Sequence, residues 1–89
     1  MRTPGFSKRA PRVDVRKSAI VINSDGVEVP ATILDISGSG FRLHISEQLY
    51  IGEFVTLRVD DETVPAQIRW VLGEEAGGAF LAPADGSIL

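Results

Sequence analysis

Apolar side chains recur at every second position in short runs of this sequence, and segments rich in Gly, Pro, Asp and Ser separate the runs. The clearest runs are residues 27–34, 41–45, 54–59 and 64–72. Successive side chains of a β-strand point to opposite faces, so a period of two is typical of strands with one buried face. No segment has the longer period of a helix. We therefore predict an all-β chain that folds as a six-stranded antiparallel barrel.

The same alternation predicts the core of the barrel. Its members are apolar residues from one face of each run, one β-branched residue of the segment at 18–23, and one aromatic residue of the last strand. They are Ile20, Val29, Ile33, Phe41, Leu43, Val55, Leu57, Ile68, Trp70 and Phe80. A chain of 89 residues has room for one such core, so we expect a single domain.

Composition restricts the class of protein. Cysteine is absent and there is one histidine, which excludes disulfides and thiolate metal sites and argues against a zinc site. No apolar run approaches the ~20 residues that span a bilayer. We therefore expect a cytoplasmic protein with no metal site and no membrane insertion.

The charge is distributed unevenly along the chain. Residues 1–17 hold six of the nine Lys and Arg residues but only one of the twelve acids. Residues 1–12 also contain Pro4, Gly5 and Pro11, so we interpret them as a flexible basic arm. A basic arm on an acidic body suggests a localised anion site. A nucleic-acid-binding protein more often spreads its basic residues over one face, so nucleic acid is not the expected partner.

The arm carries a cluster of basic residues, Lys8, Arg9 and Arg12, and Arg16 follows four positions after Arg12. Arginine has a planar fork that grips a phosphate, or the O6/N7 edge of guanine, through two hydrogen bonds. Basic runs of this kind are also common as solvated tails. The spacing alone leaves both interpretations open.

A second candidate site is the segment at residues 35–40, which lies between two predicted strands. The carboxylate of Asp35 can accept hydrogen bonds from N1–H and N2–H of guanine, and the Ser37 hydroxyl can serve a neighbouring base or phosphate atom. Gly40 would let a ligand approach the backbone closely. The alternative is an ordinary polar turn. An arm that folds onto this turn could contact one guanine from both of its edges.

Catalysis has little support in the sequence. The Ser and Gly residues at 37–40 lack the lysine and the following helix of a phosphate-binding loop. No cysteine is present to act as a nucleophile, and the single histidine, His44, gives no convincing Ser–His–acid arrangement. We therefore expect a binding protein that is not an enzyme and uses no cofactor.

Taken together, these residues resemble the PilZ domain family, whose members have an arm with the motif Arg-x-x-x-Arg, a turn of the form Asp/Asn-x-Ser-x-x-Gly and a six-stranded barrel. Residues 35–40 match the turn motif in full. Residues 66–71 and 77–80 are similar to the last two strands of the family, and residues 49–53 are similar to its mid-barrel connection.

The arm departs from the usual family pattern at one position. Residues 8–13 fit the register Arg-Arg-x-x-Arg followed by an apolar residue, but Lys8 stands in the first position. Lysine lacks the guanidinium fork, so two-point recognition would be lost there unless Arg9 compensates. Arg12 and Arg16 also satisfy the spacing, although Arg16 would then lie inside the first strand. We favour the register of Lys8 and Arg12.

The resemblance implies a division of the chain and a function. Residues 1–12 would be the arm, residues 13–84 the barrel and residues 85–89 a tail. The domain would be a cyclic di-GMP sensor that signals to an unidentified bacterial effector protein by closure of its arm. The alternative is a ligand-independent adaptor in protein–protein interaction. The implied ligand-binding residues are Lys8, Arg9, Arg12, Arg16, Asp35, Ser37 and Gly40.

Overall fold

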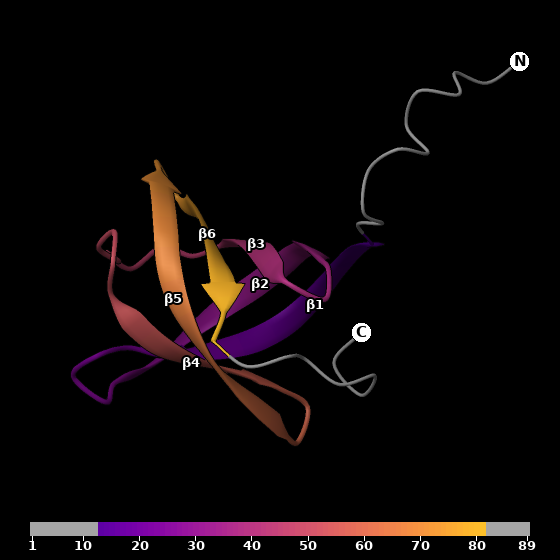
Figure 1. The fold of residues 1–89 in the computed structure, drawn as a ribbon, viewed down its shortest axis with the longest axis horizontal. Helices are drawn as coiled ribbons and strands as arrows, with labels where there is room; N and C mark the ends of the chain where they lie inside the picture. Colours follow the sequence, from indigo (N-terminus) through magenta and orange to yellow (C-terminus); the bar gives the residue numbers. More distant parts are fainter. Residues whose placement is uncertain (1–12, 82–89) are drawn as a thin grey trace, which may run out of the picture.

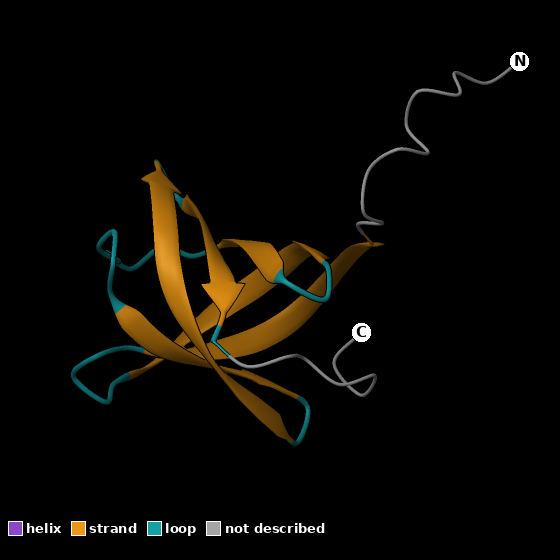
Figure 2. Cartoon of the chain, in the orientation of Figure 1, coloured by secondary structure: helices purple, strands orange, loops and turns teal. Residues whose placement is uncertain are grey.

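The computed structural model describes residues 13–81 of the chain, and all of its regular structure is β (Figures 1 and 2). The strands are β1 (Val13–Ile22), β2 (Glu28–Ile36), β3 (Gly40–His44), β4 (Phe54–Val59), β5 (Glu62–Leu72) and β6 (Glu75–Phe80). Within this described part no helix is long and apolar enough to cross a bilayer.

The six strands close into a barrel in the order β1-β2-β3-β6-β5-β4, and every neighbouring pair is antiparallel. Closure depends on β1 and β4, which pair only where residues 20–22 meet residues 56–58. The predicted six-stranded antiparallel barrel is therefore confirmed. Closure leaves few unpaired strand edges, which small antiparallel sheets must otherwise protect.

Seven of the ten predicted core side chains are buried inside the barrel. They are Val29, Ile33, Phe41, Leu43, Val55, Leu57 and Ile68. Phe80 is partly buried and packs against this core, with its ring centroid 5.3 Å from that of Phe41. The alternation of the sequence thus identified most of the inward face correctly.

Ile20 was assigned to the wrong face. It is only partly buried, whereas its neighbours Ala19 and Val21 belong to the core. The pairing of β1 with β2 places Val21 opposite Val29, and both point inward. A run of adjacent β-branched residues does not reveal by itself which of them faces the core.

Trp70 is a second correction, because it lies on the outer face and is 37% exposed. The pairing of β5 with β6 is irregular between Ile68 and Trp70, where a β-bulge adds one residue. The period of two is reset at this point, so Val71 packs against the core in place of Trp70. The indole covers Gly77, where an added Cβ would lie 2.0 Å from Nε1 of Trp70.

Glu53 connects the β1–β2 loop with the β3–β4 connection. Both lie at the end of the barrel away from residues 37–39 (Figure 1). Oε2 of Glu53 accepts hydrogen bonds from the backbone N–H (3.0 Å) and hydroxyl (2.8 Å) of Ser24, and its Oε1 accepts one from the N–H of Tyr50 (3.0 Å). Partial burial would raise the pKa of Glu53, but these hydrogen bonds outweigh it and hold the pKa below its usual value. The charged carboxylate therefore stabilises this end of the fold.

Candidate ligand-binding site

The turn between β2 and β3 is closed by its own polar groups. The N–H of Ser37 donates to the carbonyl of Gly40 (2.8 Å), and the Ser37 hydroxyl accepts from the N–H groups of Ser39 (3.4 Å) and Gly40 (3.3 Å). The N–H of Phe80 donates to the carbonyl of Ser39 (3.0 Å), which attaches the turn to the end of β6. Ser37 is thus fixed at the surface by the structure of the turn.

Gly40 has a packing role that the motif alone did not indicate. A Cβ added to Gly40 would lie 2.5 Å from the backbone carbonyl oxygen of Gly78. β3 and β6 approach each other closely at this point, since Gly40 pairs with Ala79. A glycine is therefore required here by the barrel, whether or not a ligand also comes near the backbone.

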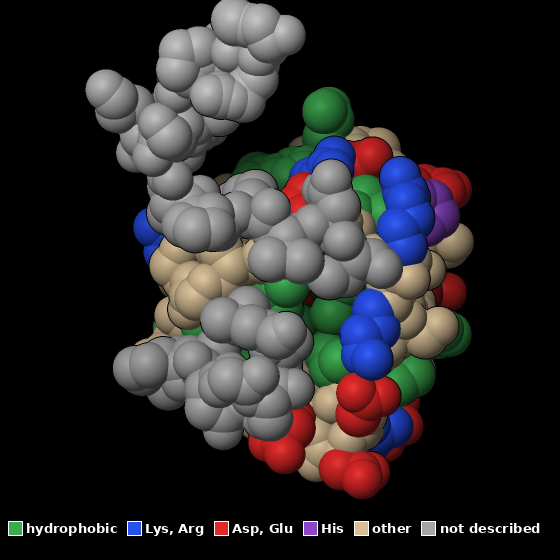
Figure 3. All heavy atoms as spheres, turned by 90° about the vertical axis from the view of Figure 1, so that its right-hand side faces the viewer, with side chains coloured by type: hydrophobic (Ala, Val, Ile, Leu, Met, Phe, Trp, Pro, Cys, Tyr) green, Lys and Arg blue, Asp and Glu red, His purple; other side chains and the backbone are tan. Residues whose placement is uncertain are grey.

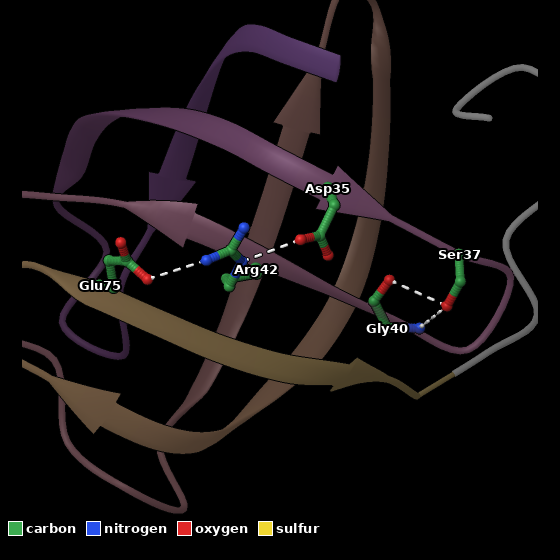
Figure 4. A network of polar contacts seen from close by, with 5 residues as sticks. All are labelled: Asp35, Ser37, Gly40, Arg42 and Glu75. Carbon is green, nitrogen blue, oxygen red and sulfur yellow. Dashed lines mark hydrogen bonds and ion pairs between the residues drawn. The ribbon is translucent and has the colours of Figure 1, made fainter. Parts of the chain in front are cut away.

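Asp35 lies at one end of a chain of three charges that crosses neighbouring strands, with Arg42 at its centre (Figure 4). Its side chain is only 7% exposed, and its Oδ2 is 2.8 Å from Nε of Arg42 on β3. Nη1 of Arg42 is 3.2 Å from Oε1 of Glu75 on β6. The hydrogen bond to Asp35 is the main reason why the pKa of Arg42 lies above its ordinary value, with burial opposing it and the charge of Glu75 adding to it.

Arg42 was not among the predicted site residues, although the sequence held a signal for it. A hairpin that turns at residues 37–40 places Asp35 opposite Arg42, and this pairing is observed. Opposite charges at paired positions of an antiparallel ladder attract each other. Glu75 had no such signal, because its approach depends on how β6 packs beside β3.

Arg16 and Arg42 line the same shallow pocket of about 260 Å³ on the outer face of β1, β2, β3 and β6. Arg16 has a φ of 51°, close to the irregular pairing between Asp14 and Lys17. The expectation that Arg16 lies inside the first strand is confirmed. Glu75 and His44 also line this pocket, so it contains a carboxylate beside the two arginines.

A row of paired residues extends from Asp35 across the outer face. Asp35 pairs with Arg42, Arg42 pairs with Gly77, and Gly77 pairs with Trp70. Paired residues carry their side chains on the same face of a sheet. The row therefore places a carboxylate, a guanidinium and a partly exposed indole on one surface, separated by a glycine without a side chain. Trp70 was not predicted as a site residue, because the alternation of apolar residues does not show the bulge that turns it outward.

The structure brings together Asp35, Ser37 and Gly40 in one turn and places Arg16 beside the neighbouring Arg42. The remaining predicted residues, Lys8, Arg9 and Arg12, lie outside the described residues, as do the predicted arm (1–12) and tail (85–89). The choice between the two arginine registers therefore stays a prediction.

Charged and apolar side chains are mixed on one face of the barrel. Figure 3 shows Lys, Arg, Asp and Glu side chains side by side around exposed apolar atoms on one face. Between residues 13 and 81, no group of three or more His, Cys, Asp or Glu side chains is placed to hold a metal ion.

Comparison with known proteins places this geometry in context. The family model described as "PilZ domain" matches residues 7–87. Among solved structures, the PilZ domain of CeSA from a cellulose-synthesizing bacterium is similar, with a TM-score of 0.71 and 22% sequence identity over 84% of each chain. No significant match was found among curated proteins. At this level of identity the structural similarity concerns the fold alone.

Proposed function

This chain belongs to the PilZ domain family, a family of cyclic di-GMP receptors, and we propose that it binds cyclic di-GMP and signals its level to a partner protein. The observation that carries the proposal is the complete Asp-x-Ser-x-x-Gly turn, which the barrel holds in a fixed conformation at its surface. Guanine offers N1–H and N2–H on one edge, and the carboxylate of Asp35 is an acceptor for both.

Three neighbours of the turn give this ligand further partners. The indole of Trp70 provides a partly exposed flat surface on which a base can stack. The guanidinium of Arg16 lies in the adjoining pocket and can neutralise a phosphate. The hydroxyl of Ser37 lies in the same turn and can donate to a phosphate or base oxygen.

The basic residues of the arm complete the proposed site. Lys8, Arg9 and Arg12 would supply charge to the two phosphates and a fork to the O6/N7 edge of guanine. We propose that the arm closes over the ligand and that the closed form makes the regulatory surface. A ligand shifts such an equilibrium only by its higher affinity for the closed state, so these contacts must form mainly on closure.

Amide hydrogen exchange with and without cyclic di-GMP tests the closure. Protection should appear across residues 5–16 and 35–40, with little change at residues 55–59, because β4 belongs to the packed barrel. Protection confined to the barrel would leave a static binding site and contradict the switch.

PilZ domains are binding domains and not enzymes, and we propose that this chain likewise lacks catalytic activity and needs no cofactor. A second candidate function is that of a ligand-independent adaptor. It is favoured by large apolar side chains that are exposed near the start of β4, namely Tyr50, Ile51 and Phe54. Such residues commonly mark protein-binding surfaces when they lie close together.

Isothermal titration calorimetry separates the two functions. We expect saturable binding of cyclic di-GMP and no binding of GTP or cyclic di-AMP. GTP is the control for guanine and phosphate charge outside a cyclic dinucleotide. Cyclic di-AMP is the control for a cyclic dinucleotide without guanine. A folded protein that binds none of the three ligands would contradict the receptor function and favour the adaptor.

A further inference from the structure

The carboxylate of Asp35 is a nearly buried charge, and its environment must compensate for the lost hydration. Its side chain is 7% exposed, and Arg42 on β3 contacts it at 2.8 Å. A buried carboxylate without a partner is strongly disfavoured, and removal of one member of a buried ion pair costs more than the pair itself contributes. Loss of Arg42 would therefore remove a charged partner from a nearly buried carboxylate.

A guanine base cannot take over this role of Arg42, because the base is neutral. Its N1–H and N2–H can donate hydrogen bonds to the carboxylate but bring no positive charge. A carboxylate has about four acceptor positions, so a guanidinium and a guanine can bond to it at the same time. The energetics thus favour a ligand that shares Asp35 with Arg42 over one that displaces Arg42.

The position of Arg42 is itself fixed from two sides. Nε contacts Asp35 on β2, while Nη1 contacts Glu75 on β6 at 3.2 Å, so the guanidinium bridges both neighbours of β3 (Figure 4). Two anchors restrict the rotation of a long side chain that would otherwise sample many rotamers. The result is a carboxylate that is held in one orientation relative to the outer face.

We infer that Arg42, anchored by Glu75, is a positioning residue that holds the Asp35 carboxylate oriented for the edge of guanine. This inference rests on the proposed function. Arg42 acts through Asp35 and not through a phosphate of the ligand. It therefore affects selectivity for the base more than the attraction of the ligand phosphates to the protein.

Selectivity between cyclic di-GMP and cyclic di-IMP is the decisive measurement, because cyclic di-IMP lacks the N2 amino group and keeps both phosphates. Calorimetry on the wild-type protein should show a preference of about tenfold for cyclic di-GMP, the typical value of one well-placed hydrogen bond to a charged acceptor. Arg42→Gln should weaken the binding of cyclic di-GMP by about tenfold or more and reduce the preference to less than about threefold.

Two further variants keep the test decisive if Arg42→Gln does not fold. Arg42→Lys preserves the positive charge, so it should keep a preference between those of wild type and Arg42→Gln. Glu75→Gln removes the second anchor only, so it should weaken cyclic di-GMP binding by a few fold, about two to five. Full wild-type affinity and selectivity in both of these variants would overturn the inference.

Arg58→Gln is the matched control. Arg58 on β4 makes an exposed ion pair with Glu28 at 3.0 Å, and β4 is not a neighbour of β3 in the barrel. Its binding and selectivity should equal those of wild type.

The outcomes are distinct. An equal loss of both ligands in Arg42→Gln, with the preference unchanged, would show that Arg42 contacts a phosphate and would overturn the positioning role alone. Absence of cyclic di-GMP binding by the folded wild-type protein would overturn the proposed function and this inference with it.

Discussion

At the level of single residues, each motif residue of the β2–β3 turn makes a contact that supports the fold. Ser37 closes the turn, Gly40 lets β3 approach β6, and Asp35 pairs with Arg42. Loss of one of these residues can therefore weaken ligand binding indirectly. Substitutions in this turn need a measurement of stability beside every measurement of affinity.

Gly40→Ala is predicted to destabilise the fold, since the new Cβ would lie 2.5 Å from the carbonyl oxygen of Gly78 and backbone atoms cannot easily move away. Overpacking of this kind typically costs about 1–3 kcal/mol. Urea denaturation measures the loss. Gly38→Ala is the matched control in the same turn, because nothing lies within 4 Å of its added Cβ. Equal stabilities of the two variants would contradict the packing role of Gly40.

Glu53→Gln is predicted to lower the free energy of unfolding at neutral pH. It should also make this free energy depend less on pH in the acid range. The pKa of Glu53 is lowered in the folded state by the hydrogen bonds from Ser24 and Tyr50. Its stabilising contribution is therefore complete above the unfolded pKa of about 4.3 and is lost as the pH falls through the lower folded pKa.

Urea denaturation of wild type and variant between neutral pH and pH 3 checks this prediction. The difference in stability should shrink as the pH falls below the unfolded pKa of the glutamate. Glu47→Gln, an exposed position in the same connection, should leave the stability curve unchanged. A constant difference between wild type and Glu53→Gln at all pH values would contradict the role of the carboxylate charge.

At the level of strands, the alternation of the sequence predicts elements well and their irregularities poorly. The hairpin of β2 and β3 follows from two alternating runs around a Gly- and Ser-rich turn, and the pairing of Asp35 with Arg42 follows from that hairpin. The bulge beside Trp70 depends on how β5 and β6 fit around the barrel, which the sequence of β5 alone does not contain. The part of the candidate site on the β2–β3 hairpin was therefore predictable from the sequence, and the part contributed by β5 and β6 was not.

The outward position of Trp70 leads to a prediction about ligand binding. Trp70→Ala should weaken cyclic di-GMP binding by about tenfold, because stacking of a base on an aromatic ring contributes roughly 1–3 kcal/mol. Trp70 is the single tryptophan of the chain, so its fluorescence reports directly on the site.

Titration of the wild-type protein with cyclic di-GMP should change this fluorescence in proportion to the bound fraction measured by calorimetry. Tyr50→Ala removes an exposed aromatic residue outside the row of Trp70 and should bind as wild type does. Saturable binding without any change in fluorescence would contradict the stacking role.

At the level of the whole molecule, the first residues of the chain and the rest of the chain carry charge of opposite sign. The first seventeen residues are strongly basic, and the remainder holds eleven of the twelve acids. Because the strands share one packed core, a ligand is expected to change the barrel little. A response that reaches a partner would therefore arise from segments attached to the barrel, in line with the proposed closure of residues 1–12.

The central claim is that the turn at residues 35–40 recognises cyclic di-GMP, and calorimetric titration of Asp35→Ala beside wild type tests it most directly. Loss of the carboxylate removes hydrogen bonds to guanine that are worth about 1.5–3 kcal/mol, so affinity should fall by roughly ten- to a hundredfold. Circular dichroism should show that the barrel is still folded. Binding of cyclic di-GMP by folded Asp35→Ala with wild-type affinity would contradict the account.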